Sequence, residues 1–170
     1  VPPREDWSFQ HADELVNFIH EHGDFCIGGA CYPEGHPECE HIMKDIANVK
    51  HKADQGLSFL TTQMFFDNDL FYKFMDEIRK AGIDIPVHAG IMPITKTNQL
   101  GTSVSLSGSS VPKKLSNLIA KYGEDPEGMK EAGTEYAIAQ VEDLIAHGVD
   151  GIHIYSMNKS DVTTKIYNAV

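Results

Sequence analysis

Side chains able to do chemistry gather in four short segments, each directly after an apolar, β-rich run. The segments span residues 30–37, 61–67, 89–95 and 155–159. Tyrosine, histidine, glutamine and lysine all occur within them. In parallel α/β proteins, ligands bind at the carboxyl ends of the strands. The functional residues of this chain are therefore expected in these four segments.

The helix expected after the first segment, over residues 38–55, carries two adjacent stripes of side chains. The apolar stripe, expected to face a sheet, consists of Ile42, Ile46, Val49 and Ala53. The polar stripe consists of His41, Asp45, Asn48 and Lys52. Most polar stripes are solvated faces. This one lies beside the apolar stripe rather than opposite it, so it could serve hydroxyls and phosphates, with Lys52 as the phosphate partner.

The elements that must position these groups alternate between helix and strand. Four helical segments end at a glycine, which caps a helix without a Cβ penalty: Gly23, Gly56, Gly82 and Gly148. The predicted strands are 25–30, 58–62, 85–89 and 151–155. The predicted helices are 9–22, 38–55, 68–81, 126–147, one after Ser160, and two pieces within 95–122 separated by a break at 107–110, the second opened by Pro112. This alternation predicts parallel pairing through right-handed crossovers.

Several side chains have expected structural places. The first helix should carry Leu15, Phe18 and Ile19 on one side, and the helix over 68–81 should bury Leu70, Phe71, Phe74, Met75 and Ile78. Asp67 is expected to cap the latter helix. His88 and His153 fall within strands and are interpreted as core histidines, and Cys26 and Cys31 as small strand hydrophobes.

Two architectures fit four parallel strands in 170 residues. One is a small doubly wound sheet, and the other is half of an eight-stranded barrel, which normally needs about 250 residues. Helical and strand periodicity cannot choose between them, because helices follow every strand in both. A glycine-rich dinucleotide fingerprint would favour the first. Gly28 and Gly29 lie within a strand and lack its spacing.

Composition excludes several classes of function. The chain is 41% hydrophobic and 23% charged with a formal net charge of −11, so nucleic acid is not expected as a partner. The sequence shows no membrane span and no signal peptide. The three cysteines are expected to be reduced in a cytoplasmic protein. Since no C-x2-C pair is present, no metal site is expected.

Five blocks of the sequence together resemble the methylenetetrahydrofolate reductase family. They are residues 32–38, the line Asp45, Asn48 and Lys52, and residues 62–67, 90–94 and 153–159. The likeness runs in order from about residue 25 to the end. It implies a flavin-binding βα barrel that reduces FAD with NADH or NADPH and passes hydride to 5,10-methylenetetrahydrofolate, giving 5-methyltetrahydrofolate. An unrelated small α/β domain would require all five blocks to be coincidence.

The resemblance implies roles for ten residues of this chain. Tyr32 and His36 match contacts to the flavin cofactor, and Asp45, Asn48 and Lys52 match positions along its ribityl and phosphate chain. His51 stands where relatives often carry arginine, so one phosphate contact is expected to be weaker or pH-dependent. The implied substrate residues are Gln63 for the pterin, Gln99 and Tyr155 near a folate and nicotinamide pocket, and Lys159, which replaces an arginine of some relatives.

The resemblance also implies what this chain lacks. The family's catalytic glutamate lies on the first barrel strand, and an aspartate beside the flavin follows the fourth. We expect a single partial TIM-type barrel domain over residues 1–170, with strands five to eight in residues 25–170. Pro2, Pro3 and the helix from Phe9 would end the fourth βα unit, within residues 1–24. The chain starts at Val1, which suggests a processed or partial chain.

Half a barrel leaves unpaired strand edges and an uncovered sheet face. The chain is therefore expected to need its first half, a second copy or another subunit, and to be oligomeric. Two functions stay open on these grounds. One is part of a folate-reducing flavoenzyme, whose isolated chain is inactive. The other is a non-catalytic barrel fragment or subunit that binds flavin or a pterin.

Overall fold

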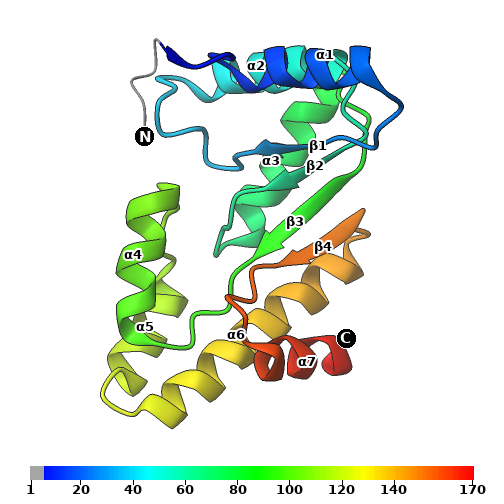
Figure 1. Ribbon diagram of the computed structural model, residues 1–170. Helices are drawn as coiled ribbons and strands as arrows, with labels where there is room; N and C mark the ends of the chain where they lie inside the picture. The colour runs from blue at the N-terminus through cyan, green and yellow to red at the C-terminus, as the bar shows by residue number, and fades with distance from the viewer. Residues whose placement is uncertain (1–5) are drawn as a thin grey trace.

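Four parallel strands form the sheet that positions the site (Figure 1). They are β1 (Gly28–Cys31), β2 (Phe59–Thr62), β3 (Val87–Ile91) and β4 (Gly151–Ile154). This computed structural model describes residues 6–170, so the predicted role of Pro2 and Pro3 lies outside the described residues. Every strand was predicted, although β3 is shifted two residues toward its carboxyl end.

The order of the strands decides between the two architectures. The sheet runs β1-β2-β3-β4, and every neighbouring pair is parallel. A doubly wound sheet reverses its strand order at a switch point, and this sheet has no such reversal. Strands that follow one another in chain order, each joined by a helical crossover, are the unit of a TIM-type barrel. The predicted α/β fold of parallel βα units is confirmed.

The helices form a layer outside the sheet, and a second group stands at its carboxyl end. Along the outer layer α1 contacts α2, α2 contacts α3, α3 contacts α6, and α6 contacts α7. Helices α4 and α5 lie at the left of Figure 1, beyond the end of β3, and α5 packs against α6. The bounds are α1 (Ala12–His22), α2 (Ile42–Asp54), α3 (Asn68–Lys80), α4 (Thr97–Ser107), α5 (Lys113–Tyr122), α6 (Pro126–Ala146) and α7 (Ser160–Ala169).

Two hydrophobic clusters hold these layers together. The larger one lies between the sheet and its outer helices and includes Ile46, Leu60, Phe71, Val87 and Val141. The smaller one joins α5 and α6 to the segments that follow β2 and β3 and comprises Phe66, Met92, Ile94, Leu115 and Met129. Burial of these side chains is the main force that fixes the helices on the sheet. None of the helices among residues 6–170 has the length and apolar character needed to cross a bilayer.

The opposite face of the sheet is lined by rings that lie over glycines of neighbouring strands. A Cβ built on Gly28 would come 2.5 Å from the Phe59 ring, and one on Gly151 would come 2.6 Å from the His88 ring. The Phe59 and His88 rings stack with centroids 4.9 Å apart. Glycine at these positions therefore lets large rings lie flat against the sheet.

The structure also differs from some expectations. Leu15 and Phe18 are 42% and 43% exposed, and Val16 is the buried residue of α1. His153 is exposed rather than in the core, and Cys26 is exposed and precedes β1. Pro112 occupies the N-cap of α5, one position before the helix. The errors of exposure share a cause, since periodicity locates an element but not the neighbour that covers it.

The ends of the helices were predicted more accurately than the exposure of side chains. The Asp67 side chain accepts a hydrogen bond from the Asp69 amide at 3.1 Å, so its predicted capping role is confirmed. Gly56, Gly82 and Gly148 have positive φ angles of 116°, 77° and 73°. Gly23, by contrast, is extended with φ of 168°, so it ends α1 without the left-handed cap.

Candidate functional site

Six residues predicted for a cofactor site line one groove of about 810 Å³, here called the α2 groove. Two of them lie in the loop after β1 and four lie on α2, which packs against β1. They are Tyr32, His36, Asp45, Asn48, His51 and Lys52. The polar stripe of α2 therefore faces the loop at the carboxyl end of the first strand.

Asp45 ties the loop to the helix. Its side chain is only 6% exposed, and Oδ2 accepts a hydrogen bond from the His36 backbone amide at 3.0 Å. The Tyr32 and His36 rings meet edge to face with centroids 4.6 Å apart. Burial, and then the Asp45 carboxylate, raise the pKa of Tyr32, which keeps its hydroxyl protonated. The loop is thus held in place by protein contacts alone.

Lys52 lines the α2 groove and reaches from α2 to β1. Its ammonium group donates to the Ala30 carbonyl, and burial lowers its pKa although Cys31 and Asp45 act in the opposite direction. Burial also raises the pKa of the Cys31 thiol to about 12, a rise that Lys52 opposes. Cys31 is therefore a protonated, unreactive core thiol. Lys52 is a cation whose only hydrogen-bond partner among the described residues is a neutral carbonyl.

The α2 groove also includes residues that the sequence did not reveal. The start of α1 closes one side with His11 and Asp13, and Lys44 lies on α2 itself. His51 Nε2 lies 3.3 Å from Asp13 Oδ2. Lys44 could have been found, because it precedes Asn48 by four residues and so shares a face of α2 with it. His11 and Asp13 carry no such signal, since only the packing of α1 on α2 brings them here.

Tyr155, a predicted substrate residue, reaches the backbone directly before Gln63, another predicted substrate residue, at the carboxyl end of the sheet. The Tyr155 hydroxyl donates to the Thr62 carbonyl at 2.8 Å, directly before Gln63. To reach it, the Tyr155 ring passes over β3 at Gly90, where a Cβ would come 2.8 Å from the ring. Gly90 thus allows a residue from beyond β4 to contact the end of β2.

Gln99 and Lys159, the other two predicted substrate residues, meet at Thr95. The Gln99 carboxamide accepts from the Thr95 amide at 3.2 Å and donates to the Pro93 carbonyl at 3.1 Å. Lys159 Nζ donates to the Thr95 hydroxyl at 2.7 Å. Gln99 therefore fixes the loop on which Lys159 rests. None of the four predicted substrate residues lines the α2 groove.

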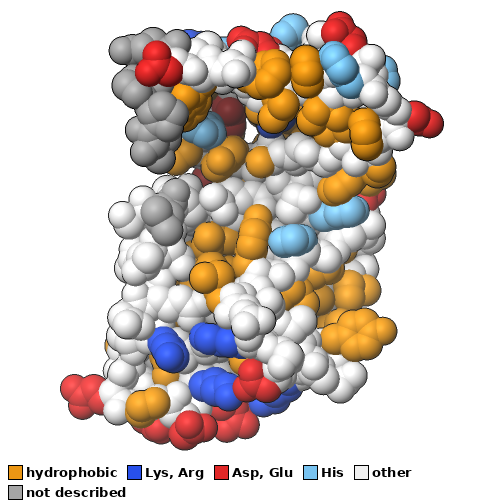
Figure 2. All heavy atoms as spheres, viewed as in Figure 1, with side chains coloured by type: hydrophobic (Ala, Val, Ile, Leu, Met, Phe, Trp, Pro, Cys, Tyr) orange, Lys and Arg blue, Asp and Glu red, His pale blue; other side chains and the backbone are white. Residues whose placement is uncertain are grey.

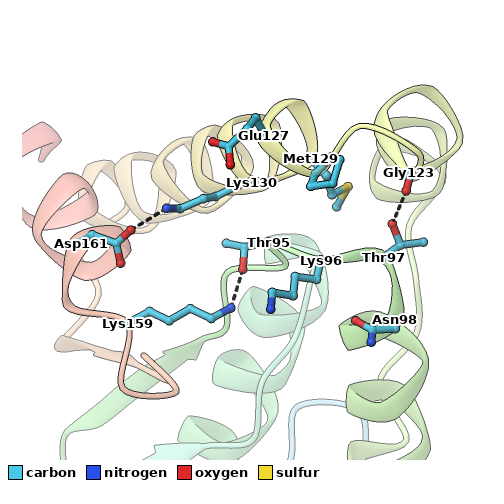
Figure 3. A pocket seen from close by; sticks show the side chains of 11 residues that line it. Thr95, Lys96, Thr97, Asn98, Gly123, Glu127, Met129, Lys130, Lys159 and Asp161 are labelled. Carbon is cyan, nitrogen blue, oxygen red and sulfur yellow. Dashed lines mark hydrogen bonds and ion pairs between the residues drawn. The ribbon is translucent and has the colours of Figure 1, made fainter.

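A second hollow of about 640 Å³, here called the lysine pocket, contains Lys159 (Figure 3). It lies where α4, α6 and α7 begin, and its cations are Lys96, Lys130 and Lys159. Lys130 pairs with Asp161 at 2.6 Å. Burial first, and then the Lys96 charge, lower the pKa of Lys159. The sequence analysis did not predict this pocket, because its residues come from three separate segments.

Within residues 6–170, no three histidine, cysteine or acidic side chains converge as metal ligands. The cysteines Cys26, Cys31 and Cys39 are all free thiols. The geometry described so far therefore consists of two hollows and a row of polar contacts along the carboxyl end of the sheet. Such groups suit the binding of polar organic ligands.

Comparison with known proteins gives a consistent result. The sequence model of the family described as "Methylenetetrahydrofolate reductase" matches residues 2–170. The 5,10-methylenetetrahydrofolate reductase of Escherichia coli is 31% identical over 166 residues, which cover 98% of this chain and 56% of the relative. Methylenetetrahydrofolate reductase 1 of Schizosaccharomyces pombe is 38% identical over 160 residues, covering 90% of this chain and 26% of the relative.

A solved structure supports the same fold. It is described as an uncharacterized protein from Clostridium thermocellum that binds two copies of 5-methyl-5,6,7,8-tetrahydrofolic acid. It superposes with a TM-score of 0.59 at 17% identity, over 90% of this chain and 56% of that one. The chain thus spans about half the length of its bacterial relatives and about a quarter of the yeast one.

Proposed function

The chain belongs to the methylenetetrahydrofolate reductase family, and on that premise we propose that it is part of a flavin-dependent enzyme. The proposed reaction reduces 5,10-methylenetetrahydrofolate to 5-methyltetrahydrofolate with NADH or NADPH. One observation carries the proposal: all six residues that the resemblance assigns to the cofactor line a single groove. Two of them come from the loop after β1 and four come from α2.

The α2 groove has the chemistry that FAD needs. Asp45 and Asn48 offer acceptors and donors to ribityl hydroxyls, Lys52 offers positive charge to a diphosphate, and His51 offers a ring N–H. The Tyr32 and His36 rings give an aromatic wall. The flavin would supply hydride transfer between a nicotinamide and the folate. The residues of this chain bind and orient it.

The residues along the carboxyl end of the sheet are proposed to hold the folate. Gln63 follows β2 and offers a carboxamide for the pterin, and Tyr155 contacts the same strand end. Gln99 and Lys159 both bind Thr95. Because these groups are fixed by contacts to the backbone or to one another, they would orient a substrate with little rearrangement.

We propose that catalysis needs a second part of the barrel. None of the strands β1 to β4 contains an aspartate or glutamate, so the sheet described here supplies no acid for the folate. In residues 6–170, β1 pairs only with β2 and β4 only with β3, which leaves two edges for further strands. The first half of the barrel, or another subunit, would pair with these edges and bring the acidic groups.

The same observation favours the second candidate for this chain in isolation. Without an acidic side chain on its strands, the chain alone would bind flavin or a pterin without turnover. The two candidates differ in a simple respect, because only the first transfers hydride. The chain is expected to show binding when alone and reduction when its barrel is complete.

The test is anaerobic reduction of the FAD-loaded, complete protein by NADH and by NADPH, followed by addition of 5,10-methylenetetrahydrofolate. The proposal predicts bleaching of the flavin absorption by at least one nucleotide and its return when the folate is added. A flavin that binds but is never bleached would support the non-catalytic candidate. A protein that takes up no FAD, is colourless as purified and binds no reduced folate would refute both candidates.

A further inference from the structure

The turn between α4 and α5 is tied to the loop that follows β1 by a single carboxylate. The backbone amide of Ser110 donates to both carboxylate oxygens of Glu34, at 3.1 and 3.0 Å. The two residues are 76 positions apart in the chain, so the contact joins two separate βα units. In Figure 1 the turn lies at the upper end of α4, toward the loop after β1. A charged acceptor makes this a stronger hydrogen bond than one between neutral groups, and we call it the Glu34 latch.

A buried serine ties the same turn to the segment that follows β2. Ser109 is only 4% exposed, and its hydroxyl donates to the Met64 carbonyl at 2.6 Å. The Ser109 amide donates to the Ser107 hydroxyl at 3.1 Å. Gly108 ends α4 in the left-handed conformation with φ of 70°, which allows the chain to turn back there. The turn is therefore held by residues that follow both β1 and β2.

Helix α4 is held on the protein more by polar contacts than by an apolar face. Among its described side chains, Leu100 and Val104 are only partly buried against the smaller hydrophobic cluster. The described side chains of α4 that are fully buried are the polar Ser103 and Ser107. The surface over α4, at the left of Figure 2, shows mostly uncharged polar side chains and backbone. Since burial of apolar surface fixes most helices, the hydrogen bonds at the ends of α4 carry a larger share of its placement.

The two ends of α4 lead to different parts of the proposed site. Near its start lies Gln99, a residue proposed to hold the folate, which is hydrogen-bonded to the loop after β3. At its far end the latch reaches Glu34, which lies between Tyr32 and His36, two residues proposed to contact the flavin. Asp45 holds that loop from the side of α2, through the His36 amide. The latch therefore connects the cofactor loop directly with the helix that carries a substrate residue.

We propose that Glu34 is a positioning residue that fixes α4 against the cofactor loop and thereby sets the affinity for the folate; this inference rests on the proposed function. Glu34 lines neither of the two hollows, and it binds a main-chain amide, so it acts through α4 rather than on a ligand. Without the latch, Gln99 would adopt the orientation that the substrate needs less often. An interaction of this kind affects the bound substrate and the transition state alike, so its loss raises KM and leaves kcat.

The first measurement is hydrogen exchange of the complete protein without FAD or folate, followed in peptides that cover α4 and the turn after it. Glu34→Ala should speed exchange in these peptides about tenfold, because a charge-assisted hydrogen bond is lost. Glu34→Gln keeps one accepting oxygen and should restore part of the protection. Ser110→Ala leaves the backbone amide in place and is the matched control. It should exchange like the unmodified protein.

The second measurement is steady-state kinetics of the FAD-loaded, complete protein with 5,10-methylenetetrahydrofolate. Glu34→Ala should raise the KM for the folate about tenfold and leave kcat within about twofold. Glu34→Gln should raise KM only about threefold, and Ser110→Ala should not change it. FAD affinity, measured by fluorescence titration, should be unchanged in all three variants, because Asp45 still holds the cofactor loop.

The outcomes separate this inference from the proposed function. Exchange in α4 that is no faster in Glu34→Ala, or a folate KM equal to that of Ser110→Ala, would overturn the inference and leave the reductase intact. Weaker FAD binding with an unchanged folate KM would also overturn it, because Glu34 would then position the cofactor loop alone. If the unmodified protein transfers no hydride to the folate, the proposed function fails, and equilibrium binding of 5-methyltetrahydrofolate decides. Weaker binding in Glu34→Ala would support the latch, and equal binding would overturn it.

Discussion

The two hollows at the carboxyl end of the sheet are built in opposite ways. In the α2 groove three of the predicted cofactor residues already contact protein groups: Asp45 accepts from the His36 amide, His51 lies beside Asp13, and Lys52 donates to a carbonyl. In the lysine pocket, cations from three elements approach one another, and two helix starts lack caps. The first hollow is thus braced by a buried carboxylate and a lysine that bind backbone groups, whereas in the second hollow burial first, and then neighbouring cations, lower the pKa of Lys159.

The two hollows therefore suit different kinds of ligand. A preassembled groove pays little ordering entropy when a cofactor binds and so suits one that remains bound. A pocket of mutually repelling cations gains most when an anion enters and suits a substrate that exchanges. The hollows also rest on different clusters, since Ile46 and Val49 under the α2 groove belong to the larger one, and Met129 in the lysine pocket belongs to the smaller.

The largest effect is expected where α6 touches the floor of the lysine pocket. A Cβ on Gly133 would come 1.8 Å from the Ile94 carbonyl oxygen, so Gly133→Ala must push α6 away from the loop that carries Thr95. Overpacking against backbone should cost about 3 kcal/mol of unfolding free energy. The measurement is chemical denaturation. The variant should retain FAD binding, since neither Gly133 nor Ile94 lines the α2 groove.

Gly101→Ala is the matched control for this prediction. Gly101 also lies in a helix, α4, but nothing approaches its hypothetical Cβ within 4 Å. Alanine is the better helix former, so this variant should be more stable by about 0.5–1 kcal/mol. If both glycine variants shifted stability in the same direction, the close contact between α6 and residue 94 would not be the support that we describe.

The next largest effect is expected on FAD binding in the α2 groove. Lys52→Met keeps the length of the side chain but removes the cation from the α2 groove. Loss of a partly buried phosphate partner should weaken FAD binding about 30-fold, or about 2 kcal/mol. Lys50→Met, on the same helix but paired with Asp54, should leave FAD affinity unchanged. Flavin fluorescence titration measures both, and equal losses would show that α2 contributes only a general positive charge.

The comparison also shows which part of the site could be predicted from sequence. The α2 groove draws its main residues from one continuous stretch, residues 32–52, in which helical spacing aligned Asp45, Asn48 and Lys52. The lysine pocket combines residues 95–98, 123–130 and 159–161, which only the tertiary fold brings together. Lys96 and Lys130 belong to no motif, so spacing gave no reason to single them out.

Some features of the fold could likewise be predicted from sequence, and others could not. Strand and helix positions followed from periodicity and glycine caps, because those signals are local. The choice of a barrel-type strand order did not follow from them, since it depends on which strands pair. The exposure of Leu15, Phe18 and His153 was equally beyond local patterns. Their surroundings are set by elements distant in the sequence.

A smaller effect concerns the smaller cluster under the lysine pocket. The Tyr136 hydroxyl donates to the Phe66 carbonyl at 2.6 Å, and burial raises its pKa to about 12. The unfolded chain loses this proton near pH 10 and the folded chain only near 12, so this contribution to stability is present below pH 10 and is lost between these values. Tyr136→Phe should remove that part of the alkaline loss and cost about 1 kcal/mol at neutral pH.

Thermal unfolding at pH 7, 10 and 11 would check this. Tyr167→Phe is the control, because Tyr167 is 77% exposed and its removal should change neither the neutral stability nor the alkaline slope. FAD affinity should be the same in both variants, since Tyr136 does not line the α2 groove. An unchanged alkaline slope in Tyr136→Phe would mean that the hydroxyl is not held in the folded state as the geometry indicates.

The smallest effect is expected for His51→Arg, which tests whether the contacts of the α2 groove can be improved for FAD. His51→Arg places a permanent, planar cation beside Asp13, where relatives are expected to carry arginine. If His51 lies near the FAD phosphates, the variant should bind FAD about threefold more tightly at neutral pH. The control is His147→Arg, on α6 beside Asp143 and outside both hollows. A gain in both variants would reflect net charge alone, whereas a gain only in His51→Arg would show that even the preassembled groove retains one unoptimised contact.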